Sequence, residues 1–149
     1  MMKSVTLGLV ALALASAAPV YAQDVEKGAN VFKRCAACHA VGEGAKNKVG
    51  PELNELFGRV AGSLPDYSYS KAMIEAGQNG RVWDSETLTA YLRKPREQVP
   101  GTKMSFAGLG KDDEIANVIA YLATFSPNYV APAAAAADGG APAAAPAAQ

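Results

Sequence analysis

The chain has 149 residues, with 14 basic and 14 acidic side chains and a formal net charge of zero. This length suits one small domain rather than several. No long basic stretch occurs in the sequence, which argues against a nucleic-acid-binding protein.

The first 22 residues have the pattern of a secretory signal peptide. Lys3 precedes an uncharged stretch, residues 5–20, which is rich in Leu and Ala. Modest or small side chains at Val20 and Ala22 predict cleavage after Ala22. An uncleaved membrane anchor is the alternative, but the stretch is short for a bilayer span and no linker separates it from the following domain. We therefore expect residues 1–22 to be a signal peptide that is removed on export.

A first helix is predicted to begin at Asp24 and to run into the segment that contains both cysteines. Acidic residues at its start suit the positive end of a helix, and Val25, Gly28 and Phe32 share one face at three- and four-residue spacing. Residues 42–50 then have the composition of a loop, which Gly50 and Pro51 close.

Shorter elements follow in the middle of the chain. The apolar residues within 53–57 predict a short helical turn before Gly58, and residues 70–75 predict a short helix that ends at Gly77. Asn79 and Gly80 together predict a turn.

Two amphipathic helices are predicted in the last third of the domain. Residues 84–87 are a capping sequence for a helix that stops before Pro95. After a loop, the charged residues 111–114 begin a last helix, in which Ile115, Val118, Ile119 and Leu122 form a continuous apolar stripe. Because strand alternation is absent from the sequence, we expect an all-α domain over 23–130, with about four to five helices and long ordered loops.

The C-terminal segment, residues 131–149, contains only Ala, Pro, Gly, one Asp and one Gln. It has no large apolar side chain whose burial could offset the entropy of ordering. The composition therefore predicts an Ala/Pro-rich flexible tail.

The pentapeptide from Cys35 to His39 holds both cysteines and the only histidine of the sequence. Cys-x-x-Cys-His is the spacing at which two thiols add to the two vinyl groups of a haem while the imidazole reaches its iron. A dithiol redox couple, a disulfide or half of a zinc site are the alternatives. A second cysteine pair, a second histidine and an alternating strand–helix pattern are all missing, so covalent attachment of one haem c through Cys35 and Cys38 is the preferred interpretation.

A second axial ligand for the iron cannot be a histidine, because His39 is the only one. Methionine is the natural candidate, since a soft thioether favours the ferrous state. Met73 lies in a predicted helix, where methionine more often fills a core. Met104 lies 65 residues after His39 in a proline-containing loop between helices, and is the preferred ligand.

With these residues in place, the chain resembles the class I c-type cytochromes, close to mitochondrial cytochrome c and the short bacterial c-two type. The likeness covers residues 24 to about 128. It rests on five ordered motifs: Cys35-Ala-Ala-Cys-His39, Gly50-Pro51-Glu52-Leu53, Leu56-Phe57-Gly58-Arg59, Tyr91-Leu92-Arg93-Lys94-Pro95 and Pro100-Gly-Thr-Lys-Met104. The resemblance implies a small domain whose loops wrap around one covalently attached haem.

The resemblance also implies roles for residues around the haem. Pro51 is expected to accept the Nδ1 proton of His39 through its carbonyl oxygen. Tyr91 and Thr102 are expected beside Met104, with the tyrosine hydroxyl bonded to the sulfur. The remaining expected haem neighbours, four of them near the propionates, are Arg59, Tyr69, Ser70, Trp83 and Phe106. For Tyr69 and Trp83, ordinary core packing is the alternative.

The chain departs from the family pattern at two places. Met73 stands where mitochondrial relatives have an internal asparagine, which puts the family's buried water network in doubt here. Glu97 is acidic within a region where the family carries lysines.

An iron with two protein ligands has no vacant site, so the sequence predicts a one-electron carrier and not an enzyme. The alternative is a haem-based peroxidase or gas-binding protein whose methionine dissociates. Basic residues near the motifs predict a docking surface for redox partners: Lys33, Arg34, Lys48, Lys94, Arg96 and Lys103. By the resemblance, we expect a periplasmic monomer that receives electrons from a cytochrome bc1-type complex and passes them to a terminal oxidase or photosynthetic reaction centre.

Overall fold

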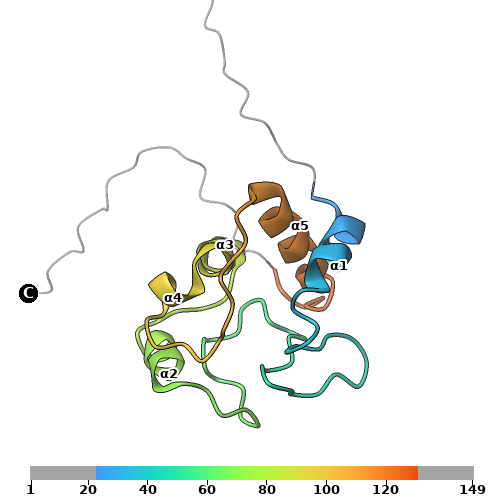
Figure 1. Ribbon diagram of the computed structural model, residues 1–149. Helices are drawn as coiled ribbons and strands as arrows, with labels where there is room; N and C mark the ends of the chain where they lie inside the picture. The colour runs from blue at the N-terminus through green and yellow to red at the C-terminus, as the bar shows by residue number, and fades with distance from the viewer. Residues whose placement is uncertain (1–22, 131–149) are drawn as a thin grey trace, which may run out of the picture.

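A computed structural model describes residues 23–130, which fold as five helices joined by long loops (Figure 1). The helices are α1 (Val25–Phe32), α2 (Lys71–Gln78), α3 (Ser85–Arg93), α4 (Pro95–Gln98) and α5 (Asp112–Ala123). Extended pairing within this range is limited to one isolated antiparallel bridge between Val60 and Val82. The all-α prediction is therefore confirmed. The predicted signal peptide, 1–22, and the predicted tail, 131–149, lie outside the described residues.

The first and last helices pack side by side, as Figure 1 shows for the blue α1 and the orange α5. Gly28 of α1 makes this approach possible, because a Cβ at that position would overlap the backbone of Asn117. The rings of Phe32 and Tyr121 pack 5.4 Å apart at the same junction. The backbone N–H of Asp24 donates to Asn117 Oδ1 over 2.9 Å, so the helix pair is tied at its beginning as well.

Side-chain caps fix where the shorter helices begin. Asp24 caps α1, and Ser70 caps α2 by accepting from the backbone N–H of Met73. Asp84 and Thr87 form a reciprocal capping box at the start of α3. These caps explain why the helix starts predicted from the sequence lie close to the observed ones.

Two local features differ from the sequence predictions. The expected helical turn over 53–57 is a series of turns, because Glu55 has a positive φ of 50°, which a right-handed helix does not accommodate. The segment after α3 was expected to be a loop, but Pro95 begins the four-residue helix α4. Proline fits the first position of a helix, where its missing N–H has no partner to lose.

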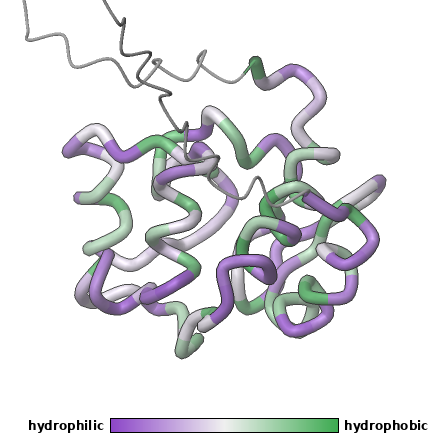
Figure 2. Tube along the Cα trace, turned by 90° about the horizontal axis from the view of Figure 1, so that it is seen from above, coloured by the Kyte–Doolittle hydropathy of each residue, from purple (hydrophilic) through white to green (hydrophobic). Residues whose placement is uncertain are grey.

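A single apolar core joins the helices to the loop that follows α1. Its most buried members include Leu109, Ile115 and Val118, and the aromatic rings of Trp83 and Tyr91 belong to it as well. Figure 2 shows that hydrophobic and hydrophilic residues alternate along the trace at short intervals. Among residues 23–130 no helix is long and apolar enough to span a membrane.

Candidate functional site

One cavity of about 270 Å³ lies between the loops and α2, α3 and α5. All twelve residues that the sequence assigned to haem attachment, iron ligation or the haem environment line it. They are Cys35, Cys38, His39, Pro51, Arg59, Tyr69, Ser70, Trp83, Tyr91, Thr102, Met104 and Phe106. The fold thus brings together residues from segments that are up to about 70 positions apart in the chain.

The two cysteines lie in a tight turn that directly continues α1. The backbone N–H groups of Cys38 and His39 both donate to the carbonyl oxygen of Cys35, over 3.0 and 2.9 Å. The thiols are free, with Cys35 partly buried and Cys38 exposed. Burial raises the pKa of the Cys35 thiol. Both thiols are therefore available at the cavity wall for thioether formation.

The His39 imidazole is oriented by one hydrogen bond. Its Nδ1 lies 2.7 Å from the carbonyl oxygen of Pro51, so the proton belongs on Nδ1 and the lone pair on Nε2. Burial lowers the pKa of His39, and the bond to Pro51 only partly opposes this, so the neutral, metal-binding form is favoured. A Cβ at Gly50 would overlap the imidazole ring, which explains the glycine there.

Met104 is held by a small network on the loop between α4 and α5. The Tyr91 hydroxyl lies 3.6 Å from the Met104 sulfur and 3.0 Å from Thr102 Oγ1. Thr102 Oγ1 also accepts from the backbone N–H of Met104, over 3.3 Å. The thioether is therefore positioned by contacts from both α3 and its own loop.

The residues expected near the propionates line the cavity but also have other partners. Arg59 donates to the backbone carbonyl groups of Glu52 and Asn54 and forms an ion pair with the Glu52 carboxylate. Ser70 caps α2, and Trp83 packs against Tyr91 with ring centroids 5.0 Å apart. Met73 is buried in the core and lines the same cavity.

The chemistry of the cavity wall fits a haem. Aliphatic and aromatic side chains, together with two methionines and a proline, make up most of its wall, and polar side chains are the minority. Its donor set is one imidazole and two thioethers, besides the two thiols that can tether the porphyrin. Residues 23–130 contain no group of three or more His, Cys, Asp or Glu side chains that would hold a bare metal ion instead.

The predicted docking residues are exposed, and most have a partner within the chain. Arg34 pairs with Glu114 at 2.6 Å, and Lys94 pairs with Glu97 at 3.0 Å. The other contacts are Lys33 Nζ to Asn30 Oδ1, Lys48 Nζ to the Ala36 carbonyl and Lys103 Nζ to the Ser68 carbonyl. Arg96 is exposed as well. Arg34 and Lys103 also line the cavity.

Sequence reasoning missed two residues at this site. Tyr67 lines the cavity, packs edge-on against Tyr69 at 4.7 Å and donates to the Val49 carbonyl over 2.6 Å. Its alternation with Tyr69 in a loop was the available signal. Glu52, the partner of Arg59, gave no signal, because only the fold places the two side chains together.

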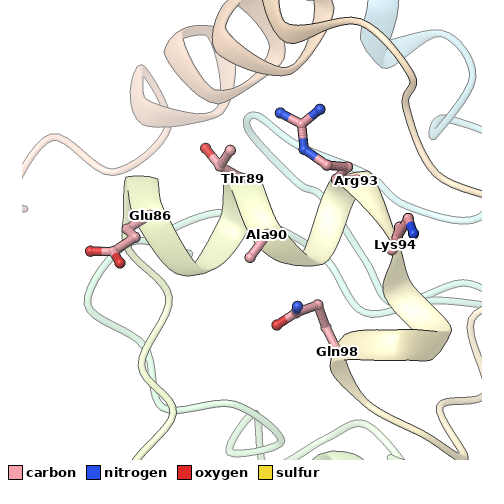
Figure 3. A pocket seen from close by; sticks show the side chains of 6 residues that line it. All are labelled: Glu86, Thr89, Ala90, Arg93, Lys94 and Gln98. Carbon is pink, nitrogen blue, oxygen red and sulfur yellow. The ribbon is translucent and has the colours of Figure 1, made fainter.

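A second hollow of about 440 Å³ lies on the outer side of α3 and α4 (Figure 3). Thr89 and Arg93 project from α3 beside it, and Gln98 projects from α4. Arg93 is already paired with Asp112 at 2.5 Å. The lining offers no thiol, imidazole or thioether, so this hollow is not a haem site.

Comparison with known proteins supports the same interpretation. A family profile described as "Cytochrome c" matches residues 25–126. The chain is 62% identical to a cytochrome c2 of Afifella marina over 101 residues, which are 68% of this chain and 82% of that protein. It is 45% identical over 125 residues to a cytochrome c2 of Blastochloris viridis, covering 84% and 95% of the two chains. The solved cytochrome c2 from Rhodospirillum centenum superposes with a TM-score of 0.65 at 42% identity, covering 70% of this chain and 99% of that one.

The fold and the cavity define a small helical protein that carries one haem on a Cys-x-x-Cys-His turn. The chain belongs to the cytochrome c family. Its cofactor is a covalently bound haem c, and it is a monohaem electron carrier rather than an enzyme. Its partners are accordingly redox partners.

Proposed function

We propose that this protein carries single electrons in the periplasm between membrane respiratory or photosynthetic complexes, with His39 and Met104 as the axial ligands of its haem iron. The observation that carries the proposal is the convergence of an oriented imidazole and a restrained thioether on one apolar cavity. The signal-peptide pattern of residues 1–22 supports the periplasmic location.

Bound haem iron supplies reversible one-electron exchange. The chain's own residues orient and hold the two axial ligands. Pro51 fixes the imidazole tautomer, which directs His39 Nε2 at the cavity, and Tyr91 with Thr102 holds the Met104 sulfur. The apolar wall excludes water, so little solvent has to rearrange when the iron changes its charge. Such an arrangement favours electron transfer over binding of a substrate.

The haem-based peroxidase or gas-binding alternative requires Met104 to leave and a polar group to take over in the cavity. The sequence has no second histidine for that purpose. The network that holds Met104 also opposes its departure. The spectroscopic test of methionine ligation distinguishes this alternative from the electron carrier.

The test of ligation is the visible spectrum of the ferric holoprotein and of two methionine variants. Wild type is expected to show the methionine–iron charge-transfer band at the red edge. Met104→Ala should abolish the band, whereas the matched control Met73→Leu should retain it because Met73 is assigned to packing. A band that survives in Met104→Ala, or disappears in Met73→Leu alone, would overturn the assignment.

For the partners, we propose a cytochrome bc1-type complex as donor and a terminal oxidase or photosynthetic reaction centre as acceptor. The exposed basic residues near the cavity support docking to acidic surfaces, with the protein acting as a monomer. Glutamine substitutions at Lys48 and Lys103 should lower the bimolecular electron-transfer rate at low salt, and the difference should vanish at high salt. Lys27→Gln, on the first turn of α1, is the control. If the variants at Lys48 and Lys103 transferred electrons at low salt as fast as wild type and Lys27→Gln, this docking surface would be excluded.

A further inference from the structure

Arg59 and Glu52 form an ion pair at the edge of the cavity that holds the haem site. Arg59 Nη2 lies 3.3 Å from Glu52 Oε1, and Arg59 itself lines the cavity. The side chains are only 12% and 17% exposed, in contrast to the other ion pairs of residues 23–130, each of which has at least one partner that is more than 40% exposed. The pair is therefore the one that solvent and salt screen least.

The geometry of the pair leaves little freedom to either charge. Arg59 also donates to the carbonyl groups of Glu52 and Asn54, and the second carboxylate oxygen of Glu52 accepts from the backbone N–H of Asn54 over 2.8 Å. Asn54 in turn exchanges two hydrogen bonds with the backbone of Gly42. Both charges are thus fixed in position relative to the cavity.

The electrostatic reach of Arg59 is visible at a neighbour. Burial raises the pKa of Tyr69, and the positive charge of Arg59 acts in the opposite direction on the same hydroxyl. Tyr69 lines the cavity beside Arg59. A guanidinium at the wall of this cavity would also act on the charge of an iron centre held there.

We propose that Glu52 is a potential-setting residue: by neutralising Arg59 at the cavity edge, its carboxylate lowers the reduction potential of the haem. The ferric state carries one more positive charge than the ferrous state, so an uncompensated guanidinium nearby would disfavour it and raise the potential. With the Glu52 carboxylate in place the pair is neutral and this effect is cancelled. The inference rests on the proposed His39–Met104 haem carrier.

The experiment compares the midpoint potentials of Glu52→Gln and Glu55→Gln with that of the wild-type holoprotein. Glutamine at 52 keeps an oxygen that can accept from Asn54, so it removes the charge without removing the acceptor. Glu55 lies three residues along the same loop and is exposed, so its loss should be screened. We expect a higher potential for Glu52→Gln that persists at high salt, and little change for Glu55→Gln.

A double variant separates charge from structure. Arg59→Gln alone should lower the potential, and Glu52→Gln/Arg59→Gln should return it toward the wild-type value because both charges are gone. An unchanged or lower potential for Glu52→Gln, or a double variant whose potential does not return toward the wild-type value, would overturn the proposal. The red-edge band is recorded for each variant: its absence from wild type would instead refute the methionine ligation on which the inference rests.

Discussion

The hydroxyl of Tyr91 contacts the sulfur of Met104 at 3.6 Å and Thr102 Oγ1 at 3.0 Å, and so joins α3 to the loop before α5. Burial raises the pKa of Tyr91, which keeps the hydroxyl protonated well above neutral pH. The contact therefore restrains the thioether over the whole physiological range. Its strength can be measured through the stability of the proposed iron–sulfur bond.

Replacing Tyr91 by phenylalanine is expected to loosen Met104 while preserving the packing of the ring on Trp83. One neutral hydrogen bond contributes about 0.5–1.5 kcal/mol, so the population without methionine ligation should rise by up to about tenfold. A pH titration of the red-edge band measures this as a lower midpoint for loss of the band. Tyr129→Phe, whose ring packs on Phe57, is the control and should titrate like wild type. The same pH midpoint in wild type, Tyr91→Phe and Tyr129→Phe would show that the Tyr91 hydroxyl does not restrain the Met104 sulfur.

The junction between α1 and α5 predicts a strong effect of Gly28→Ala. A Cβ at residue 28 would overlap the Asn117 carbonyl and approach Tyr121, so the helices must separate. Overpacking of this kind costs about 1–3 kcal/mol, and more where the obstacle is backbone. Chemical denaturation of the holoprotein measures the loss. Gly110→Ala is the matched control, because a Cβ there meets nothing within 4 Å, and a comparable loss in both variants would contradict the steric explanation.

The Arg34–Glu114 ion pair predicts an acid-sensitive contribution to stability. The hydrogen bond from Arg34 lowers the pKa of Glu114 below its ordinary value of 4.5. A carboxyl group whose pKa is depressed on folding stabilises the native state above its unfolded pKa, and this contribution is lost as the pH falls through the native pKa. Glu114→Gln should therefore lower stability at pH 7 and make the decline from pH 5 to pH 3 shallower. Denaturation curves from pH 3 to pH 7 measure the effect, with the exposed Glu43→Gln as control. The same pH dependence of stability in both variants would show that the Arg34–Glu114 pair makes no such contribution.

Removal of the haem is expected to leave the domain largely unfolded. The apolar side chains around the cavity would then face a water-filled space, and a ligand that binds only the native state would no longer contribute its binding energy. The haem-free double variant Cys35→Ala/Cys38→Ala should lack a cooperative denaturation transition and give weak near-ultraviolet circular dichroism. The holoprotein provides the reference. A cooperative, near-native transition without haem would refute this expectation.

The sequence was sufficient to predict most of the helices because their ends carry local signals. Asp24, Ser70 and Asp84 cap the helices whose starts were expected there, and the apolar stripe of α5 has helical period. The turn over 53–57 was predicted wrongly, since apolar spacing cannot reveal that Glu55 adopts a positive φ. The short α4 was missed because a proline that stops one helix can also begin the next.

The candidate site was predictable for a different reason. His39 is the only histidine of the sequence. Of its four methionines, Met1 and Met2 lie in the predicted signal peptide and Met73 in a predicted helix, which leaves Met104 in a loop, so elimination restricted the choice before any geometry was known. The pairing of Glu52 with Arg59 had no such restriction. Seven residues separate them in an irregular loop, where no periodicity relates sequence spacing to spatial distance.

The contact between Asp24 and Asn117 also has a consequence for how the protein is made. These residues are 93 positions apart, and α1 reaches its final packing only against α5. Because a chain emerges from its amino end, the turn that bears Cys35 and Cys38 is available before the helix that completes its support exists. We expect a chain truncated before Asp112 to accept haem covalently but to remain unfolded. Mass spectrometry and circular dichroism of this fragment would separate attachment, an early event, from closure of the domain, which waits for the last helix.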